Sequence, residues 1–267
     1  MILAAFSLKQ LPFQKDISRK NLFLNKTYEE MESRLQFLRD TMGIGLFTGE
    51  IGSGKSTMLR MMEQSLNPQL FKFVYLHRGM DNLGNFYNQF ALRLGIQPKY
   101  RKADVSQQVL NAIEELSTEQ KIKTFLVLDE AHLLKPDILD EIRLIHNAEM
   151  DSKDYLATAI VGQPPLRKMM GYMKYLPLAQ RISVSFHLPA LNRDDAYKYF
   201  EHHMKIAGGN SKVFKDNAVE TIINASKGIP RVINNIALKA MYNAVQEKMT
   251  IVDQECVHSA MKELGLR

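Results

Sequence analysis

The most informative stretch of the sequence is Gly49-Glu50-Ile51-Gly52-Ser53-Gly54-Lys55-Ser56, which matches the consensus G-x-x-x-x-G-K-[S/T] in full. Glycines allow the backbone to turn tightly, so that its N–H groups point into a concavity of the size of a phosphate. Lys55 can reach the outer phosphates of a nucleotide, and the Ser56 hydroxyl can bind Mg²⁺, which prefers hard oxygen ligands. These eight residues, with Thr57, form the predicted nucleotide-binding loop.

The regions on either side of this loop have the pattern that such a loop requires. The apolar run 44–49 predicts a strand before it, and 55–66 predicts a helix after it, whose N-terminus favours an anion. Further strands are expected at 72–77, 124–129, 155–162 and 182–188, with helical patterns between the first four strands. This alternation predicts an α/β fold with a parallel five-stranded sheet and helices on both faces.

The pattern changes after Pro189 and becomes helical throughout. The helical segments are expected at 193–207, 215–226, 230–247 and 253–264. We therefore predict three parts along the chain. They are an N-terminal lead-in (1–26), an α/β nucleotide-binding domain (27–190) and a small all-helical lid domain (191–267).

A second motif lies at the end of the strand expected at 124–129. Four apolar residues from Phe125 lead into Asp129 and Glu130, at the edge of the sheet where ligands bind in open α/β folds. Asp129 can hold magnesium through water. Glu130 can orient and deprotonate an attacking water, as phosphoryl transfer to water requires.

Composition limits the class of protein only broadly. The formal net charge is +6, and this permits binding to nucleic acid or to an anionic membrane without establishing either. The single cysteine, Cys256, excludes a disulfide framework within the chain and favours the cytoplasm. No apolar run approaches the roughly 18 residues of a membrane-spanning helix, and the N-terminus lacks the features of a secretory signal, so we expect no membrane partner.

Six stretches in order carry a family resemblance. They are TGEIGSGKST (48–57), LVLDEAHLL (126–134), EIRLIHNAEMDS (141–152), IVGQPPLR (160–167), LAQRISVSFHL (178–188) and KGIPRVINNIA (227–237). With these motifs, the chain resembles AAA+ ATPases, and most closely the ExeA-like group among them. The resemblance implies that the protein binds ATP and Mg²⁺ and hydrolyses ATP to ADP and phosphate.

The resemblance also implies roles for three residues outside the first two motifs. Gln163 would sense the γ-phosphate beside the attacking water, although it could be an ordinary amide at a strand end. Arg231 would reach the phosphates from the helical domain, or be a plain surface charge. Arg181 matches an arginine finger that acts in a neighbouring subunit's site, which implies self-association into a ring or filament; its alternative is a local ion pair.

Two basic regions are candidates for contact with DNA. The run Lys99-Tyr100-Arg101-Lys102 combines cations with an aromatic ring, a combination that suits a nucleic-acid backbone and a stacked base. A solvated loop explains the same run equally well. Arg78 is the second candidate, because ATPases similar to this chain that hold DNA often use the segment after the strand at 72–77.

The resemblance leaves the target of the ATPase open between two classes. The chain is similar in size to transposition-helper ATPases of the MuB, TniB and TnsC type, which would assemble on double-stranded DNA and recruit a transposase. The alternative is an ExeA-like secretion or envelope-assembly ATPase with a protein target. Such proteins typically carry a transmembrane helix and a periplasmic domain after the ATPase core, and this sequence reaches Arg267 with neither. We therefore expect the first class. A third class, which fits the sequence less well, is a nucleotide-dependent switch that does not bind DNA.

Overall fold

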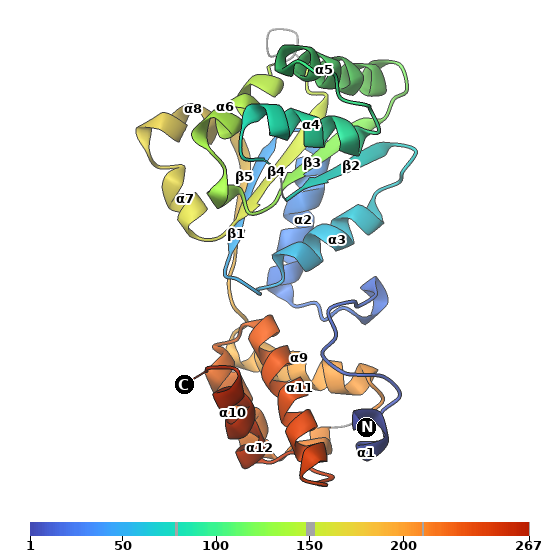
Figure 1. Cartoon of the computed structure of the whole chain (residues 1–267), viewed down its shortest axis with the longest axis vertical. Coiled ribbons are helices and arrows are strands. Elements are labelled where there is room, and N and C mark those ends of the chain that lie inside the picture. Colours follow the sequence, from blue (N-terminus) through green and yellow to red (C-terminus); the bar gives the residue numbers. More distant parts are fainter. Residues whose placement is uncertain (78–79, 148–152, 210, 267) are drawn as a thin grey trace. The chain divides into compact units, whose positions relative to one another are not determined.

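The computed structural model describes residues 1–77, 80–147, 153–209 and 211–266 (Figure 1). The chain forms two compact units. The sheet unit contains Tyr28–Gly49 and Lys55–Leu188, and the helical unit contains Met1–Thr27, Glu50–Gly54 and Pro189–Arg267. The helical unit thus includes both the lead-in and five residues of the glycine-rich loop. The division into domains at residues 26 and 190 stays a prediction.

The sheet unit contains one sheet of five parallel strands, as predicted. The strands are β1 (Ile44–Gly49), β2 (Phe71–Leu76), β3 (Lys123–Leu128), β4 (Leu156–Gly162) and β5 (Ile182–Leu188), each within one residue of its expected bounds. Their order is β2-β3-β4-β1-β5, and every neighbouring pair is parallel. The carboxyl ends of β3, β4 and β1 therefore lie side by side at one edge of the sheet.

Helices pack on both faces of this sheet. The main ones are α2 (Lys26–Thr41), α3 (Lys55–Ser65), α4 (Leu83–Leu94), α5 (Lys102–Thr118) and α6 (Pro136–Ile145), followed by the short α7 (Pro165–Met169) and α8 (Leu176–Ala179). Ile44 and Leu46 of β1 join a core that includes the apolar faces of α4, α5 and α6. Gly45 faces the opposite side, where a Cβ atom would lie 2.7 Å from Leu38 of α2. Successive residues of β1 thus point to opposite faces of the sheet, and each face has its own apolar core.

The helical unit is built from α9 (Arg193–Ile206), α10 (Asp216–Ser226), α11 (Pro230–Gln246) and α12 (Gln254–Glu263), with the single-turn α1 (Ile2–Ala5) from the lead-in. Side-chain caps start two of these helices: Asn192 accepts from the Asp195 N–H, and Asp253 accepts from the Cys256 N–H. Gly228 has a φ of 72°, and a Cβ there would lie 1.9 Å from the Leu191 carbonyl oxygen, so only glycine fits before α11.

The described helices were also compared with the requirements for crossing a bilayer. Within the described parts of the chain, none combines the length and the apolar character that a membrane-spanning helix needs.

Candidate nucleotide-binding site

The glycine-rich loop connects β1 to α3 through left-handed backbone. Gly52 and Gly54 have φ values of 82° and 108°, which other residues adopt only with strain. Lys55 begins α3 and is buried, and its Nζ donates a 2.7 Å hydrogen bond to the Gly49 carbonyl oxygen at the other end of the loop. The lysine ammonium and the first turn of α3 thus come together in the sheet unit, an arrangement that favours an anion.

Asp129 is the first residue after β3, and its carboxylate is buried among polar groups. Oδ2 accepts a 2.5 Å hydrogen bond from the Tyr75 hydroxyl of β2 and lies 3.4 Å from Ser56 Oγ, a donor at the start of α3. Oδ1 accepts from the Glu130 N–H at 2.9 Å. The three contacts hold the carboxylate in one orientation, toward the first turn of α3.

The Ser56 hydroxyl and the Asp129 carboxylate fit a magnesium ion bound together with a nucleotide. Both are hard oxygen ligands, and their oxygens converge to 3.4 Å. Among the described residues, no group of three or more His, Cys, Asp or Glu side chains could hold a metal by itself. Mg²⁺ commonly uses one or two protein oxygens, completed by phosphate oxygens and water, so this small donor set suits it.

Glu130 has an unusual backbone and two polar neighbours. Its φ of 56° is left-handed, which is uncommon for glutamate and directs the side chain away from the line of β3. Oε2 accepts a 3.2 Å hydrogen bond from Gln163 Nε2, just beyond β4, and lies 3.7 Å from His132 Nε2. The side chain keeps about 43% of its surface exposed, so water can reach it. The structure therefore brings Glu130 and Gln163 together, as a shared role requires.

Arg231 contacts the glycine-rich loop within the helical unit. Its backbone N–H donates to the Gly52 carbonyl oxygen at 3.3 Å, and a Cβ atom on Gly52 would lie 2.6 Å from Arg231 Cβ. Arg231 is the second residue of α11 and is exposed. Its main chain therefore packs against the loop residues Glu50–Gly54, and a bulkier residue at 52 would disturb that contact.

Arg181 lies between α8 and β5. Its Nη2 donates a 2.6 Å hydrogen bond to Asn147 Oδ1, and the side chain is half-buried.

The DNA candidates differ in what the structure describes. Lys99, Arg101 and Lys102 are exposed at the start of α5, and Tyr100 between them is fully exposed. Arg78 lies outside the described residues.

Sequence reasoning missed two residues of this site. Tyr75 reaches Asp129 from a neighbouring strand, and no motif marks it. His132 Nε2 lies 3.7 Å from Glu130 Oε2, and its Nδ1 lies 3.5 Å from the Gln163 backbone nitrogen. Its position two residues after Glu130 was the available signal.

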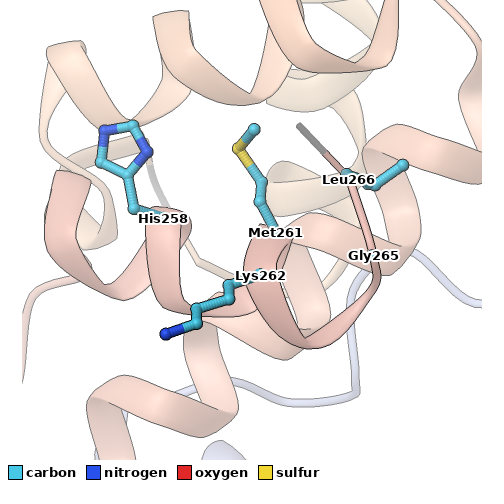
Figure 2. A pocket seen from close by; sticks show the side chains of 5 residues that line it. All are labelled: His258, Met261, Lys262, Gly265 and Leu266. Carbon is cyan, nitrogen blue, oxygen red and sulfur yellow. The ribbon is translucent and has the colours of Figure 1, made fainter.

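A separate hollow of about 520 Å³ lies at the end of α12 (Figure 2). It is lined by His258, Met261, Lys262, Gly265 and Leu266. It contains no residue of the glycine-rich loop or of the acidic pair, so it is distinct from the nucleotide-binding site.

Residues 38–170, which include the loop, Asp129, Glu130 and Gln163, match the family model described as an AAA domain. The chain carries an AAA+ ATPase domain. The general secretion pathway protein A of Aeromonas hydrophila is 30% identical to it over 246 residues, which cover 90% of this chain and 44% of that protein. The chain thus spans under half the length of this relative.

Solved structures share the fold of the AAA+ domain and of the helices that follow it. Cdc6p from Pyrobaculum aerophilum has a TM-score of 0.70 and 20% identity, covering 98% of this chain and 70% of that one. The ORC1 protein of Aeropyrum pernix, solved in complex with DNA, has a TM-score of 0.72 and 18% identity, covering 93% and 68%. At these identities the likeness establishes the fold alone.

Proposed function

We propose that this protein is an ATP-dependent, DNA-binding AAA+ ATPase that assembles on duplex DNA and regulates or targets a transposase. One observation carries the catalytic part: Asp129, Glu130 and Gln163 meet at the sheet edge where β1 leads into the phosphate loop.

In this proposal the loop and α3 bind ATP with Mg²⁺. The backbone of 49–57 surrounds the phosphates, and Lys55 neutralises charge on the outer two. Ser56 and Asp129 hold the magnesium ion, Asp129 through water. The bound ion supplies charge stabilisation to the phosphate oxygens, which is the chemistry expected of it in such sites.

Glu130 and Gln163 then act on the attacking water. Glu130 accepts a proton from this water, whose oxygen forms the new bond to the γ-phosphorus while the bond to the bridging oxygen of ADP breaks. Gln163 donates to Glu130 Oε2, so it can orient the base and contact the γ-phosphate from the same position. His132 Nε2 lies 3.7 Å from the same carboxylate oxygen, Oε2.

Arg181 acts in trans in this proposal. An arginine finger neutralises charge that develops on the transferred phosphoryl group, and guanidinium suits this because it stays charged and makes forked contacts. The hydrogen bond to Asn147 holds the guanidinium in place at the surface of the sheet unit. Hydrolysis would therefore require a ring or filament in which each Arg181 reaches the next subunit's nucleotide. Arg231 would couple the helical unit to the phosphates.

Two observations support DNA as the surface of assembly. The fold is that of the Aeropyrum pernix ORC1 protein, whose structure was solved with DNA. Lys99, Arg101 and Lys102 present three exposed cations around an exposed aromatic ring. The transposase follows from the resemblance of the sequence to transposition-helper ATPases.

One finding favours an alternative function. The relative that is 30% identical is a general secretion pathway protein, so an ATPase that acts on an envelope protein is the second candidate. The two functions differ in their need for DNA, because only the first predicts assembly on a duplex.

The decisive experiment images the purified full chain with a non-hydrolysable ATP analogue, with and without duplex DNA. We expect rings or filaments that form on the duplex only with the analogue. The same sample is titrated with salt in a binding assay, where sequence-independent binding should weaken steeply as salt rises. If the protein is shown to bind the analogue but does not bind duplex DNA at low salt, the transposition proposal is wrong. The result would then favour the alternative, an ATPase that acts on an envelope protein.

A further inference from the structure

The first 27 residues carry most of the excess positive charge of the chain. They contain five basic residues and one acidic residue, and so supply +4 of the net +6. All five basic side chains are exposed: Lys9, Lys15, Arg19, Lys20 and Lys26. We call residues 8–26 the basic strap. Charge concentrated in one segment generates a stronger local potential than the same charge spread over a surface.

The basic strap is fixed to α9 by apolar anchors. Phe13 is 2% exposed and packs its ring 5.0 Å from the ring of Phe200 and 5.4 Å from that of His203. Farther along, the Phe23 ring meets Tyr199 of α9 edge-on at 5.7 Å. Leu8 is also buried. Each aromatic anchor buries a large apolar area, so the strap is held as part of the helical unit.

Polar contacts fix the strap at three places, twice through its backbone and once through a side chain. The Lys9 N–H donates to the Ala207 carbonyl oxygen at 2.9 Å, at the end of α9. His202 Nε2 donates to the Asn21 carbonyl oxygen at 2.7 Å, and Asn25 Nδ2 donates to Asp195 Oδ2 at 2.8 Å, near the start of α9. These contacts pass from the end of α9 toward its start as the strap runs forward, so the two segments are antiparallel.

The turn after α9 is shaped to receive the start of the strap. A Cβ atom on Gly208 would lie 2.8 Å from the Lys9 side chain, and one on Gly209 would lie 2.4 Å from Leu8. The two glycines thus leave room for both residues. The aliphatic stem of Lys9 lies against Gly208, which leaves the ammonium group outside.

We propose that the basic strap is a contact surface for the phosphate backbone of duplex DNA, and this inference rests on the DNA-binding function proposed above. The strap buries Leu8 and Phe13 and exposes its five cations, on a backbone held by hydrogen bonds to α9. Ordering before binding lowers the entropy lost on association. A duplex presents about one negative charge per 1.7 Å of its axis, so an elongated row of cations can contact several phosphates at once.

These contacts would be independent of base sequence. Lys and Arg contacts to phosphate position a protein on the duplex and carry no sequence information. The strap lies in the helical unit, whereas Lys99, Arg101 and Lys102 lie in the sheet unit. The inference thus adds a contact surface to the helical unit, where sequence reasoning assigned none.

The test combines Lys15→Gln, Arg19→Gln and Lys20→Gln in the full chain. The matched control combines Lys227→Gln, Lys248→Gln and Lys262→Gln, which removes the same charge from exposed positions of the same unit. A third variant, Lys15→Arg, Arg19→Lys and Lys20→Arg, keeps the charge. Each protein is titrated with random-sequence duplex over a range of salt concentrations in the presence of a non-hydrolysable ATP analogue. Analogue affinity and the unfolding midpoint show that each protein is folded.

We expect the strap variant to bind duplex DNA less tightly. The slope of log affinity against log salt concentration should become shallower by about 2.7, because three phosphate contacts are lost. The control and the charge-conserving variant should keep the wild-type slope. An unchanged slope in the strap variant, with wild-type protein binding duplex, overturns this inference and leaves the proposed function standing. If the wild-type protein does not bind duplex DNA, both the role of the basic strap and the proposed DNA-binding function are wrong. If the strap variant loses binding to anionic lipid vesicles while its salt slope for duplex DNA is unchanged, this inference is wrong and the strap contacts a membrane surface instead.

Discussion

The Tyr75 hydroxyl donates a 2.5 Å hydrogen bond to Oδ2 of Asp129, the same oxygen that lies 3.4 Å from Ser56 Oγ. Burial, together with this hydrogen bond, raises the pKa of Tyr75 above its usual value, so the phenol stays protonated and remains a donor. A tyrosine of β2 thereby fixes the carboxylate that follows β3. In the proposed site, Tyr75 is a positioning residue for the magnesium ligand.

Replacing Tyr75 with Phe should raise the magnesium concentration needed for half-maximal ATP hydrolysis by about 10-fold, because a partner that orients a metal ligand has been lost. The measurement is the hydrolysis rate as a function of Mg²⁺ at saturating ATP. Tyr87→Phe is the matched control, since it removes a similar 2.6 Å hydrogen bond, to Glu141, away from the site. Equal magnesium dependence in the two variants would contradict the role of Tyr75.

Glu130→Gln should bind ATP as the wild type does and hydrolyse it about 100-fold more slowly or worse. The amide keeps the shape of the side chain but cannot accept the proton of the attacking water. Binding of a fluorescent ATP analogue and phosphate release, measured on the same preparation, separate the two effects. A normal rate of phosphate release would mean that Glu130 is not the general base.

Arg181→Ala should bind ATP normally and hydrolyse it poorly. Lys55→Ala should lose nucleotide binding, because the phosphates lose their main cation. A mixture of the two inactive proteins should recover part of the activity, since some interfaces then pair an intact loop with an intact arginine finger. Phosphate release is measured against the mixing ratio. If the two proteins co-assemble and the mixture stays inactive, Arg181 does not act in trans.

Replacing Lys99, Arg101 and Lys102 together with Gln should weaken duplex binding and reduce the salt slope by about 2.7, with ATP binding intact. The three side chains are exposed at the start of α5, so neutralising them should leave the fold unchanged. The assay is duplex binding over a range of salt concentrations with an ATP analogue. If the slope does not change, these residues lie away from DNA, and Arg78 becomes the next candidate.

His203 makes the stability of the helical unit dependent on pH. Burial, with a smaller effect of the neighbouring His202, lowers the pKa of His203 to about 4. Among the described residues, Nδ1 has no hydrogen-bond partner, so nothing compensates a charge there. The unfolded chain binds this proton near pH 6.5 and the folded chain only near 4, so stability falls as pH falls between these values.

The expected loss from pH 6.5 to pH 4 is up to about 3 kcal/mol, since each unit of pKa difference corresponds to about 1.4 kcal/mol. Urea unfolding at several pH values measures it. His203→Phe, which keeps an aromatic ring against Phe13, should remove most of this dependence. His258→Gln, at an exposed position of α12, should leave it unchanged. A pH profile that is the same with and without His203 would contradict the assignment.

Features set by neighbouring residues could be predicted from sequence. The strand before the loop and the one that leads into Asp129 are largely continuous apolar runs, which buried parallel strands require. The loop itself follows from glycine spacing. Glu130 was expected near the nucleotide because it follows a buried strand of the parallel sheet, and Gln163 because the family resemblance implies it. Their direct hydrogen bond depends on the left-handed backbone of Glu130, which local pattern does not reveal.

Contacts between distant segments could not be predicted in this way. Nothing in the sequence near Phe13 indicates that the partner of its ring is Phe200. Tyr75 occupies an ordinary position in an alternating strand, and only the strand order β2-β3 places it beside Asp129. Pairings of this kind depend on tertiary packing, which a single sequence does not encode locally.

The close fit of Gly52 against Arg231 also limits how this protein can evolve or be re-engineered. Glu50–Gly54 cluster with the C-terminal helices although they are encoded between β1 and α3. Exchanging the C-terminal helices for those of a relative would keep the phosphate-binding motif intact in sequence while replacing the surface against which it packs. The two units are therefore not interchangeable modules. Working chimaeras should need the loop and the start of α11 to be inherited from the same parent.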